Sequence, residues 1–169
     1  MSGKVLGSAF RDVVQSLMGA ELLLPELRQR VEGISDDEWA PWDEYVEACN
    51  ALADLLEDQT VTRIGEQVMA SARPLLERQG FPTANAALAD WRAVFLSNVR
   101  DLPEASIPTT VLVTEHEAVI DYPLELPPPL IEGFLRGVAL AYGHRVEGFE
   151  AVRHQGASGL RLRCRLAFR

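Results

Sequence analysis

The chain has 169 residues, of which 47% are hydrophobic and 24% are charged, a composition typical of one globular domain with a sizeable core. Its formal net charge of −9 argues against a broad nucleic-acid surface, and no apolar run approaches the roughly 20 residues that span a bilayer. We therefore expect a single domain over residues 1–169, with no nucleic-acid partner and no membrane span. Arg11 and Asp12 interrupt what would be the apolar segment of a signal peptide, so the expected location is cytoplasmic.

The sequence contains no evident catalytic or metal-binding pattern. Cys49 and Cys164 lie far apart in apolar surroundings, which favours two reduced core thiols over a disulfide. Three histidines without clustered thiols are too few for a structural zinc site, so we predict no metal and no other cofactor. No histidine pairs with a cysteine or serine as base and nucleophile, and we predict that the protein is not an enzyme. Acid and base pairs can assemble in space, which keeps an enzyme as the third alternative.

The first part of the chain, residues 1–103, has the period of amphipathic helices. Apolar residues recur at intervals of three and four, and the predicted helices cover residues 5–18, 26–32, 41–56, 61–76 and 84–99. Gly19 and Gly33 are expected to close the first two helices, and Pro74 is expected to kink or end the fourth. We expect these helices to form a bundle.

The second part, residues 104–169, changes to the period of strands. Two β-branched runs in "TTVLVTEHEAVIDY" flank a polar turn at residues 115–117 and predict a hairpin, and "QGASG" marks the turn of a second hairpin. A helix is predicted between them over residues 128–142. The predicted fold class is α+β, with an N-terminal helical bundle packed on a small antiparallel sheet and a helix between the two hairpins.

The helix between the hairpins carries small residues on one side, Gly133 and Gly137 with Ala141 one turn later. Glycine costs about 1 kcal/mol relative to alanine inside a helix, so the two glycines, here called the glycine stripe, need a packing reason. The stripe favours close contact with the sheet or a neighbouring helix, and the alternatives are a ligand pocket or a tight dimer contact. The triple proline at residues 127–129 predicts an extended link followed by a helix start.

Positive charge is concentrated on the last predicted strand, where Arg161, Arg163 and Arg165 alternate with apolar residues. We call these three residues the arginine stripe. The apolar residues expected to face the core are Leu160, Leu162, Cys164, Leu166 and Phe168. The usual explanation for such arginines is a solvated sheet face balanced by acids, and the alternative is docking of an acidic partner or an anionic ligand.

The order of these elements resembles the superfamily of haem nitric-oxide/oxygen-binding (H-NOX) domains, vinyl-reductase-like ligand-binding domains and Bet3-type trafficking subunits. The resemblance rests on "DYPLELPPPLIEGFLRGVALAYGHRVEGFEAVR" and the closing "GLRLRCRLAF" strand, and it is best over residues 111–168. In these domains a strand ends in tyrosine, a proline-containing link follows, and a helix opens with "GLLRG"-like residues. The nearest likeness is to a myxobacterial group of paralogous proteins of unknown function, in which "LPP" leads into an "EG" helix.

The haem-binding features that the resemblance would imply do not match. Haem-binding members hold the propionates with tyrosine, serine and arginine at alternating positions, whereas this chain has Tyr122, Leu124 and Leu126 there. Their proximal histidine lies on the helix before the sheet, and "ANAALADWRAVFLSNVR" contains no histidine. The expectation is therefore a haem-free member of this group.

The resemblance implies a sensor or an assembly module, which gives two hypotheses for function. The first is a haem-free regulatory domain that binds a small apolar ligand between the helices and the sheet. Its candidate ligand-binding residues are Trp91, Phe95, Phe134 and Tyr142. Plain core packing is the alternative for each of these residues. The second hypothesis is a homodimer or protein-binding module without a ligand, which would use the glycine stripe or the arginine stripe.

Overall fold

The computed structural model describes residues 3–18, 29, 31–157 and 159–169, and its fold class is α+β, as predicted. The helices are α1 (Gly7–Met18), α3 (Trp42–Ala53), α4 (Asp58–Ser71), α5 (Arg73–Arg78), α6 (Ala84–Ala89), α7 (Trp91–Leu96) and α8 (Pro128–Ala141). The strands are β1 (Lys4–Leu6), β2 (Trp39–Pro41), β3 (Val99–Arg100), β4 (Thr109–Val113), β5 (Glu117–Pro123), β6 (Val146–Gly156) and β7 (Gly159–Phe168). Gly19 and most of the helix predicted over residues 26–32 lie outside the described residues. Within the described ranges, no helix has the length and apolar character needed to cross a membrane.

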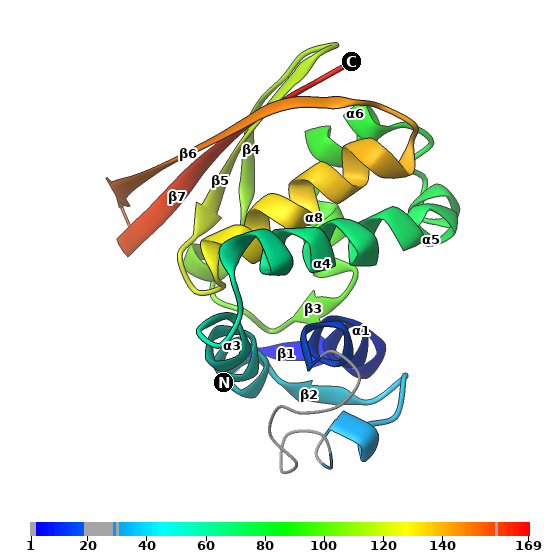
Figure 1. Cartoon of the computed structure of the whole chain (residues 1–169), viewed down its shortest axis with the longest axis vertical. Helices are drawn as coiled ribbons and strands as arrows, with labels where there is room; N and C mark the ends of the chain where they lie inside the picture. The colour runs from blue at the N-terminus through cyan, green and yellow to red at the C-terminus, as the bar shows by residue number, and fades with distance from the viewer. Residues whose placement is uncertain (1–2, 19–28, 30, 158) are drawn as a thin grey trace.

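The two predicted hairpins join into one four-stranded antiparallel sheet with the order β4-β5-β7-β6. β5 pairs with β7 from Glu117 opposite Ala167 to Pro123 opposite Arg161, so the hairpins meet through their inner strands. The long hairpin of β6 and β7 extends at its tip beyond the helices (Figure 1). Leu160 lies near this tip and is 49% exposed, which corrects its expected place in the core, because no helix reaches it.

Helix α8 packs between α4 and the four-stranded sheet, which we call the main sheet. Contact on both sides explains why so much of the surface of α8 is apolar. Ile131, Leu135 and Val138 are almost fully buried. Its first turn contains Pro128 and Pro129, where the amide that proline lacks would have no partner within the helix. The helix start predicted at the triple proline is therefore confirmed.

The contact between α4 and α8 is so close that a side chain would not fit at its centre. A Cβ added to Gly133 would lie 2.3 Å from the carbonyl oxygen of Thr62 and 2.8 Å from the Cα of Gly65. A Cβ added to Gly137 would lie 2.6 Å from the carbonyl oxygen of Glu66. These are backbone atoms, which cannot move aside as the end of a side chain can. The glycine stripe therefore serves close packing of two helices.

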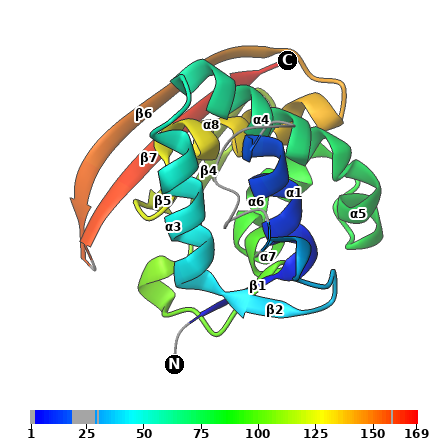
Figure 2. The same ribbon diagram turned by 60° about the horizontal axis from the view of Figure 1, so that its bottom comes forward.

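A second sheet, which the sequence pattern does not predict, has three short strands in the order β2-β1-β3. Val5 pairs with Ala40 in β2 and with Val99 in β3, and α1 begins only at Gly7. The helix predicted over residues 5–18 is therefore wrong in its first two residues. Strands of two or three residues are too short to show an alternating pattern. Figure 2 shows β1 leading directly into α1 and β2 leading into α3.

The helix predicted over residues 84–99 is divided into α6 and α7 at Asp90. Asp90 has φ −117° and ψ 51°, and its carboxylate accepts a hydrogen bond from the amide of Ala93 as the N-cap of α7. Helix α4 ends at Ser71, and Pro74 lies in the first turn of α5. The predicted end of the helix at this proline is therefore confirmed.

Replacing Gly133 with alanine is expected to lower the free energy of unfolding by about 2 kcal/mol, because the new Cβ must separate α4 from α8. This loss should appear although alanine is the better helix former by about 1 kcal/mol. Urea unfolding followed by circular dichroism measures the change. Gly148→Ala is the matched control, since a Cβ there would meet no atom within 4 Å and should change stability by less than about 0.5 kcal/mol. Equal effects of the two substitutions would contradict the close helix contact.

Candidate functional site

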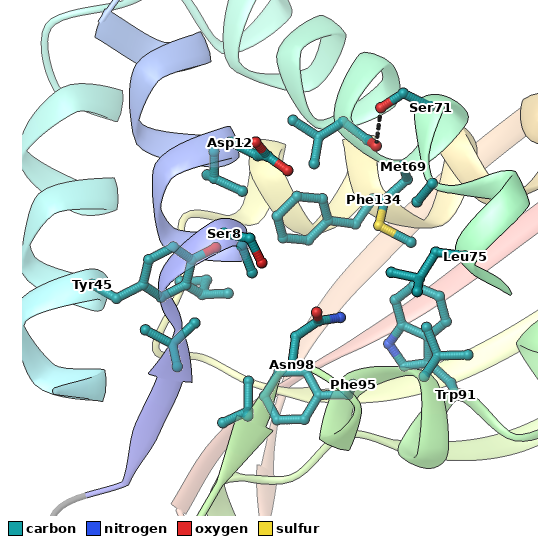
Figure 3. Close-up of a pocket in the computed structure, with 18 of the residues that line it drawn as sticks. Ser8, Asp12, Tyr45, Met69, Ser71, Leu75, Trp91, Phe95, Asn98 and Phe134 are labelled. Atoms are coloured by element: carbon teal, nitrogen blue, oxygen red, sulfur yellow. Dashed lines mark hydrogen bonds between the residues drawn. The ribbon is translucent and has the colours of Figure 1, made fainter. Parts of the chain in front are cut away.

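A pocket of about 290 Å³ lies between β1 and α1 on one side and α4, α7 and α8 on the other (Figure 3). Its size is close to the lower end of the range for small-molecule sites, which is about 300–1,000 Å³. Half of the residues that line it are aliphatic or sulfur-containing: Val5, Ala9, Val13, Val68, Met69, Ala72, Leu75, Val94, Val99 and Leu126. A concave surface of this kind suits an apolar molecule.

Aromatic rings from three parts of the chain form one wall of the pocket. The Tyr45 and Trp42 rings of α3 have centroids 5.3 Å apart, and Trp42 meets Phe95 of α7 at 5.7 Å. Phe95 in turn contacts Tyr122 of β5 at 6.2 Å. The indole N–H of Trp42 donates to the Glu125 carboxylate at 2.7 Å, which ties this wall to the link between β5 and α8. The contacts of Phe95 with Trp42 and with Tyr122 are edge-to-face, a geometry that favours fixed ring orientations.

Polar side chains in the pocket are few. Ser8 and Asp12, one turn apart on α1, line it together with Ser71 at the end of α4 and Asn98, which follows α7. Asp12 is exposed at the mouth of the pocket; partial burial raises the pKa of its carboxyl, Asp36 adds to the rise, and Arg11 opposes it. The described residues that line the pocket include no lysine, arginine or histidine. An anionic ligand would therefore meet a carboxylate and no counter-charge.

The indole N–H of Trp91 is buried in the pocket and has no hydrogen-bond acceptor. Trp91 is 2% exposed, and its Nε1 is the one buried side-chain nitrogen or oxygen without a partner in the described part of the chain. Burial raises the pKa of Tyr122 and the nearby Trp91 N–H opposes this rise, but the two groups do not meet hydrogen-bond geometry. A buried donor without an acceptor costs about 1–3 kcal/mol, so it requires an explanation.

Most of the aromatic residues predicted to bind a ligand do line this pocket. Trp91, Phe95 and Phe134 reach it from α7 and α8. Tyr142 does not, because it lies at the C-terminal end of α8 and its hydroxyl donates to the carbonyl oxygen of Phe81. The guanidinium of Arg73 lies 5.2 Å from the centre of its ring. Tyr142 therefore holds the loop between α5 and α6, and its predicted place beside a ligand is corrected.

The side of the pocket that β1 and α1 supply is not predicted from the sequence pattern. This side consists of Val5, Ser8, Ala9, Asp12 and Val13. One signal for it is present, because Ser8 and Asp12 are one turn apart and adjoin the apolar face of the helix. A polar pair beside an apolar face is common on surface helices, so the pattern alone does not distinguish a pocket from solvent.

The two stripes predicted as interaction surfaces are engaged within the chain. Gly133 and Gly137 are buried against α4 and are not on a surface that a partner could reach, which corrects their expected role in a dimer contact. In the arginine stripe, Arg165 pairs with Glu117 at 2.9 Å, and Arg163 lies 3.5 Å from a second carboxylate, that of Asp121. These pairs fit the interpretation of a sheet face balanced by acids.

Arg161 and Asp121 form the centre of a largely buried cluster on the outer face of the sheet. Asp121 is 7% exposed, and its carboxylate lies 2.5 Å from both the Arg161 Nε and the His154 Nε2. Arg161 also donates to the carbonyl oxygens of Ala105 and Ile107, at 2.8 and 3.1 Å. Burial by itself raises the pKa of Asp121, but hydrogen bonds and positive charge from His154 and Arg161 hold it below its ordinary value. The cluster fastens the segment before β4 to the sheet.

No protein-family model and no curated protein matches this sequence. The chain is similar to an oxygen-binding H-NOX domain related to soluble guanylate cyclases, with 14% identity and a TM-score of 0.67 over 96% of this chain and 94% of that one. It is similar to a mutant H-NOX domain from T. tengcongensis, with 14% identity and a TM-score of 0.64 over 96% and 95%. It is also similar to a structure described in terms of haem redox potential and porphyrin distortion, with 14% identity and a TM-score of 0.62 over 96% of this chain and 99% of that one. The chain therefore has an H-NOX-like fold.

The residues of the pocket do not fit haem, which takes histidine, cysteine, methionine or tyrosine as its axial ligand. The pocket offers the phenols of Tyr45 and Tyr122, but burial raises the pKa of both and keeps them protonated. The remaining candidate for an axial ligand is Met69. In cytochromes a methionine thioether ligates haem together with a histidine, and the described lining of this pocket has no histidine. Leu126 lines the pocket where the resemblance would require a polar anchor for a propionate.

The carboxylate of Asp121 is expected to stabilise the fold in a pH-dependent way. Its pKa is lower in the folded chain, so its contribution is complete above the ordinary value of 3.8 and is lost as the pH falls through the folded value. Asp121→Asn should therefore lower the free energy of unfolding by about 2 kcal/mol at about pH 7, and by less at about pH 3.

Urea unfolding of both proteins at the two pH values tests this expectation. Glu150→Gln is the control, because the Glu150 side chain is 76% exposed and lies 4.0 Å from Arg165. Its loss should change stability by less than about 0.5 kcal/mol. If Asp121→Asn costs the same at both pH values, the lowered pKa is wrong.

Proposed function

We propose that this chain, with its H-NOX-like fold, is a haem-free sensory domain that binds a small apolar ligand in the pocket between α1 and α8. The observation that carries the proposal is a pocket of about 290 Å³ whose lining is mostly apolar and lacks a histidine ligand for haem. Removal of apolar ligand surface from water favours binding by about 25 cal/mol per Å², against which the entropy cost of association is set. The few polar groups at its edge would orient the ligand.

A ligand in this pocket would touch two parts of the fold at once. Val5 and Ala9 come from β1 and α1, whereas Phe134 comes from α8, which packs on the main sheet. A ligand that contacts both parts stabilises the conformation in which their separation matches the size of the ligand. Binding therefore shifts the population toward that conformation. Because α8 packs on the main sheet, ligand binding in the pocket would in this way alter the position of the sheet and so transmit a signal.

The alternative proposal is a ligand-free module for dimerisation or protein binding. It is supported by exposed apolar side chains of the main sheet, since Val152 is 64%, Val111 53% and Leu112 47% exposed. A partner would use these side chains, because the glycine stripe is buried and the arginine stripe is paired with acids.

Two further points stay predictions. One is the resemblance to vinyl-reductase-like domains, Bet3-type subunits and the myxobacterial group, and the other is the cytoplasmic location.

Filling the pocket should abolish most ligand binding without unfolding the protein. N-phenyl-1-naphthylamine, an uncharged fluorescent dye, is the probe, and its emission on titration with protein gives the affinity. Ala9→Leu, which places a larger side chain in the pocket, should weaken dye binding about tenfold. Ala51→Leu makes the same change at an exposed position of α3 outside the pocket and should leave the affinity unchanged. A wild-type protein that does not bind the dye, or equal affinities of the two variants, would sink the proposal.

Absorption spectroscopy tests the haem-free part of the proposal separately. Addition of haemin to the purified protein should give the sum of the two separate spectra, because the pocket has no histidine and no propionate anchor. A shifted Soret band that saturates at one haemin per chain would show that the pocket accepts haem.

A further inference from the structure

The buried N–H of Trp91 restricts the chemistry of the ligand that the pocket would hold, because this donor needs a hydrogen-bond acceptor. Figure 3 shows the indole nitrogen of Trp91 facing the interior of the pocket, as does the amide of Asn98. The Asn98 amide already donates to the Ser97 hydroxyl at 3.1 Å, whereas Trp91 Nε1 has no partner. Trp91 is 2% exposed, and the phenol of the nearby Tyr122 does not meet hydrogen-bond geometry, so an acceptor for the Trp91 N–H has to come from the interior of the pocket.

The charge of the pocket restricts the ligand further. Asp12 is the charged side chain of the described lining, and no lysine, arginine or histidine accompanies it. A carboxylate or phosphate on the ligand would be repelled by Asp12 and would lose its hydration without gaining a cation. These groups supply acceptors for Trp91, but at a cost that an uncharged acceptor avoids.

The indole donor also distinguishes between uncharged acceptors. A carbonyl oxygen accepts hydrogen bonds and brings no donor of its own, so it can satisfy Trp91 among apolar neighbours. A hydroxyl brings a second donor that needs its own acceptor, and a water molecule needs two to four polar partners. The lining offers mainly hydrocarbon, which makes a lone acceptor the best match.

We propose that the ligand is a small uncharged hydrocarbon-like molecule with a carbonyl group, a ketone or an aldehyde, whose oxygen accepts the N–H of Trp91. This inference rests on the proposed function, because it names the chemistry of the same pocket. Trp91 is then the residue that selects for the oxygen, and the aromatic wall of Trp42 and Phe95 contacts the hydrocarbon part of the molecule.

Three compounds of the same shape test the proposal by displacing N-phenyl-1-naphthylamine from the wild-type protein. The compounds are 2-acetylnaphthalene, 2-isopropenylnaphthalene, in which a methylene group replaces the oxygen, and the anion 2-naphthoate. The ketone should bind about tenfold more tightly than the alkene, because only the ketone satisfies the buried N–H. It should also bind more tightly than the anion, which meets Asp12.

The Trp91→Phe variant links this preference to the indole, since phenylalanine keeps an aromatic ring and removes the donor. The tenfold preference for the ketone should disappear in this variant. Trp39→Phe is the matched control, because Trp39 lies in β2 outside the pocket, against the guanidinium of Arg100, and its loss should leave the preference intact.

A spectroscopic measurement keeps the test decisive if Trp91→Phe does not fold. The chain has three tryptophans, and their indole N–H signals in a proton–nitrogen NMR spectrum report hydrogen bonding directly. The Trp91 signal should move downfield with the ketone and not with the alkene.

The possible outcomes separate this inference from the proposed function. Equal binding of ketone and alkene, or a preference that persists in Trp91→Phe, would overturn the inference and leave an apolar ligand site in place. An indole signal that does not respond to the ketone would do the same. If the dye and all three naphthalenes fail to bind, both the proposed function and this inference are wrong.

Discussion

The close contact between α4 and α8 is the constraint on which the pocket depends. Gly65 and Gly133 let the two backbones approach until a single added Cβ on Gly133 would clash with the carbonyl of Thr62. Met69 on α4 and Phe134 on α8 therefore enter one pocket from adjacent helices. At the ordinary separation of packed helices, about 8–10 Å, these side chains would spread apart. Helix α8 also contacts β6 and β7 of the main sheet, so helices and sheet form one support for the site.

The pocket lies in an H-NOX-like fold, and its described lining contains no histidine that could ligate haem. The chain has the H-NOX-like fold over nearly its whole length, although it is only 14% identical to the structures that it matches. Function on a common fold is decided by the residues of the site. Here the lining includes Leu126, an apolar residue, and Trp91, whose buried N–H is a donor among apolar neighbours. Both residues support the proposal of an organic ligand that is held by its apolar surface and by one hydrogen bond.

Much of the element order could be predicted from the sequence, because each signal is local. The prolines before α8, the turn before β5 and the alternation of β7 each depend on neighbouring residues alone. The sheet of β1, β2 and β3 could not be predicted in this way, because Val5 finds its partners, Ala40 and Val99, far along the chain. Asp90 belongs to a residue type that often caps helices, but the apolar period continues across it, so the break between α6 and α7 is not predicted.

The sequence by itself determined the α+β class, the need of the glycine stripe for a close neighbour, and the apolar character of Leu124 and Leu126. These properties follow from side-chain type and spacing, which every segment carries with it. Only the tertiary structure decided that α4 faces the glycine stripe, that Arg161 is held by Asp121, and that the Trp91 N–H is left without an acceptor. The physical reason is that burial and hydrogen bonding depend on which segments lie side by side. The pattern within one segment does not specify the segment that will face it.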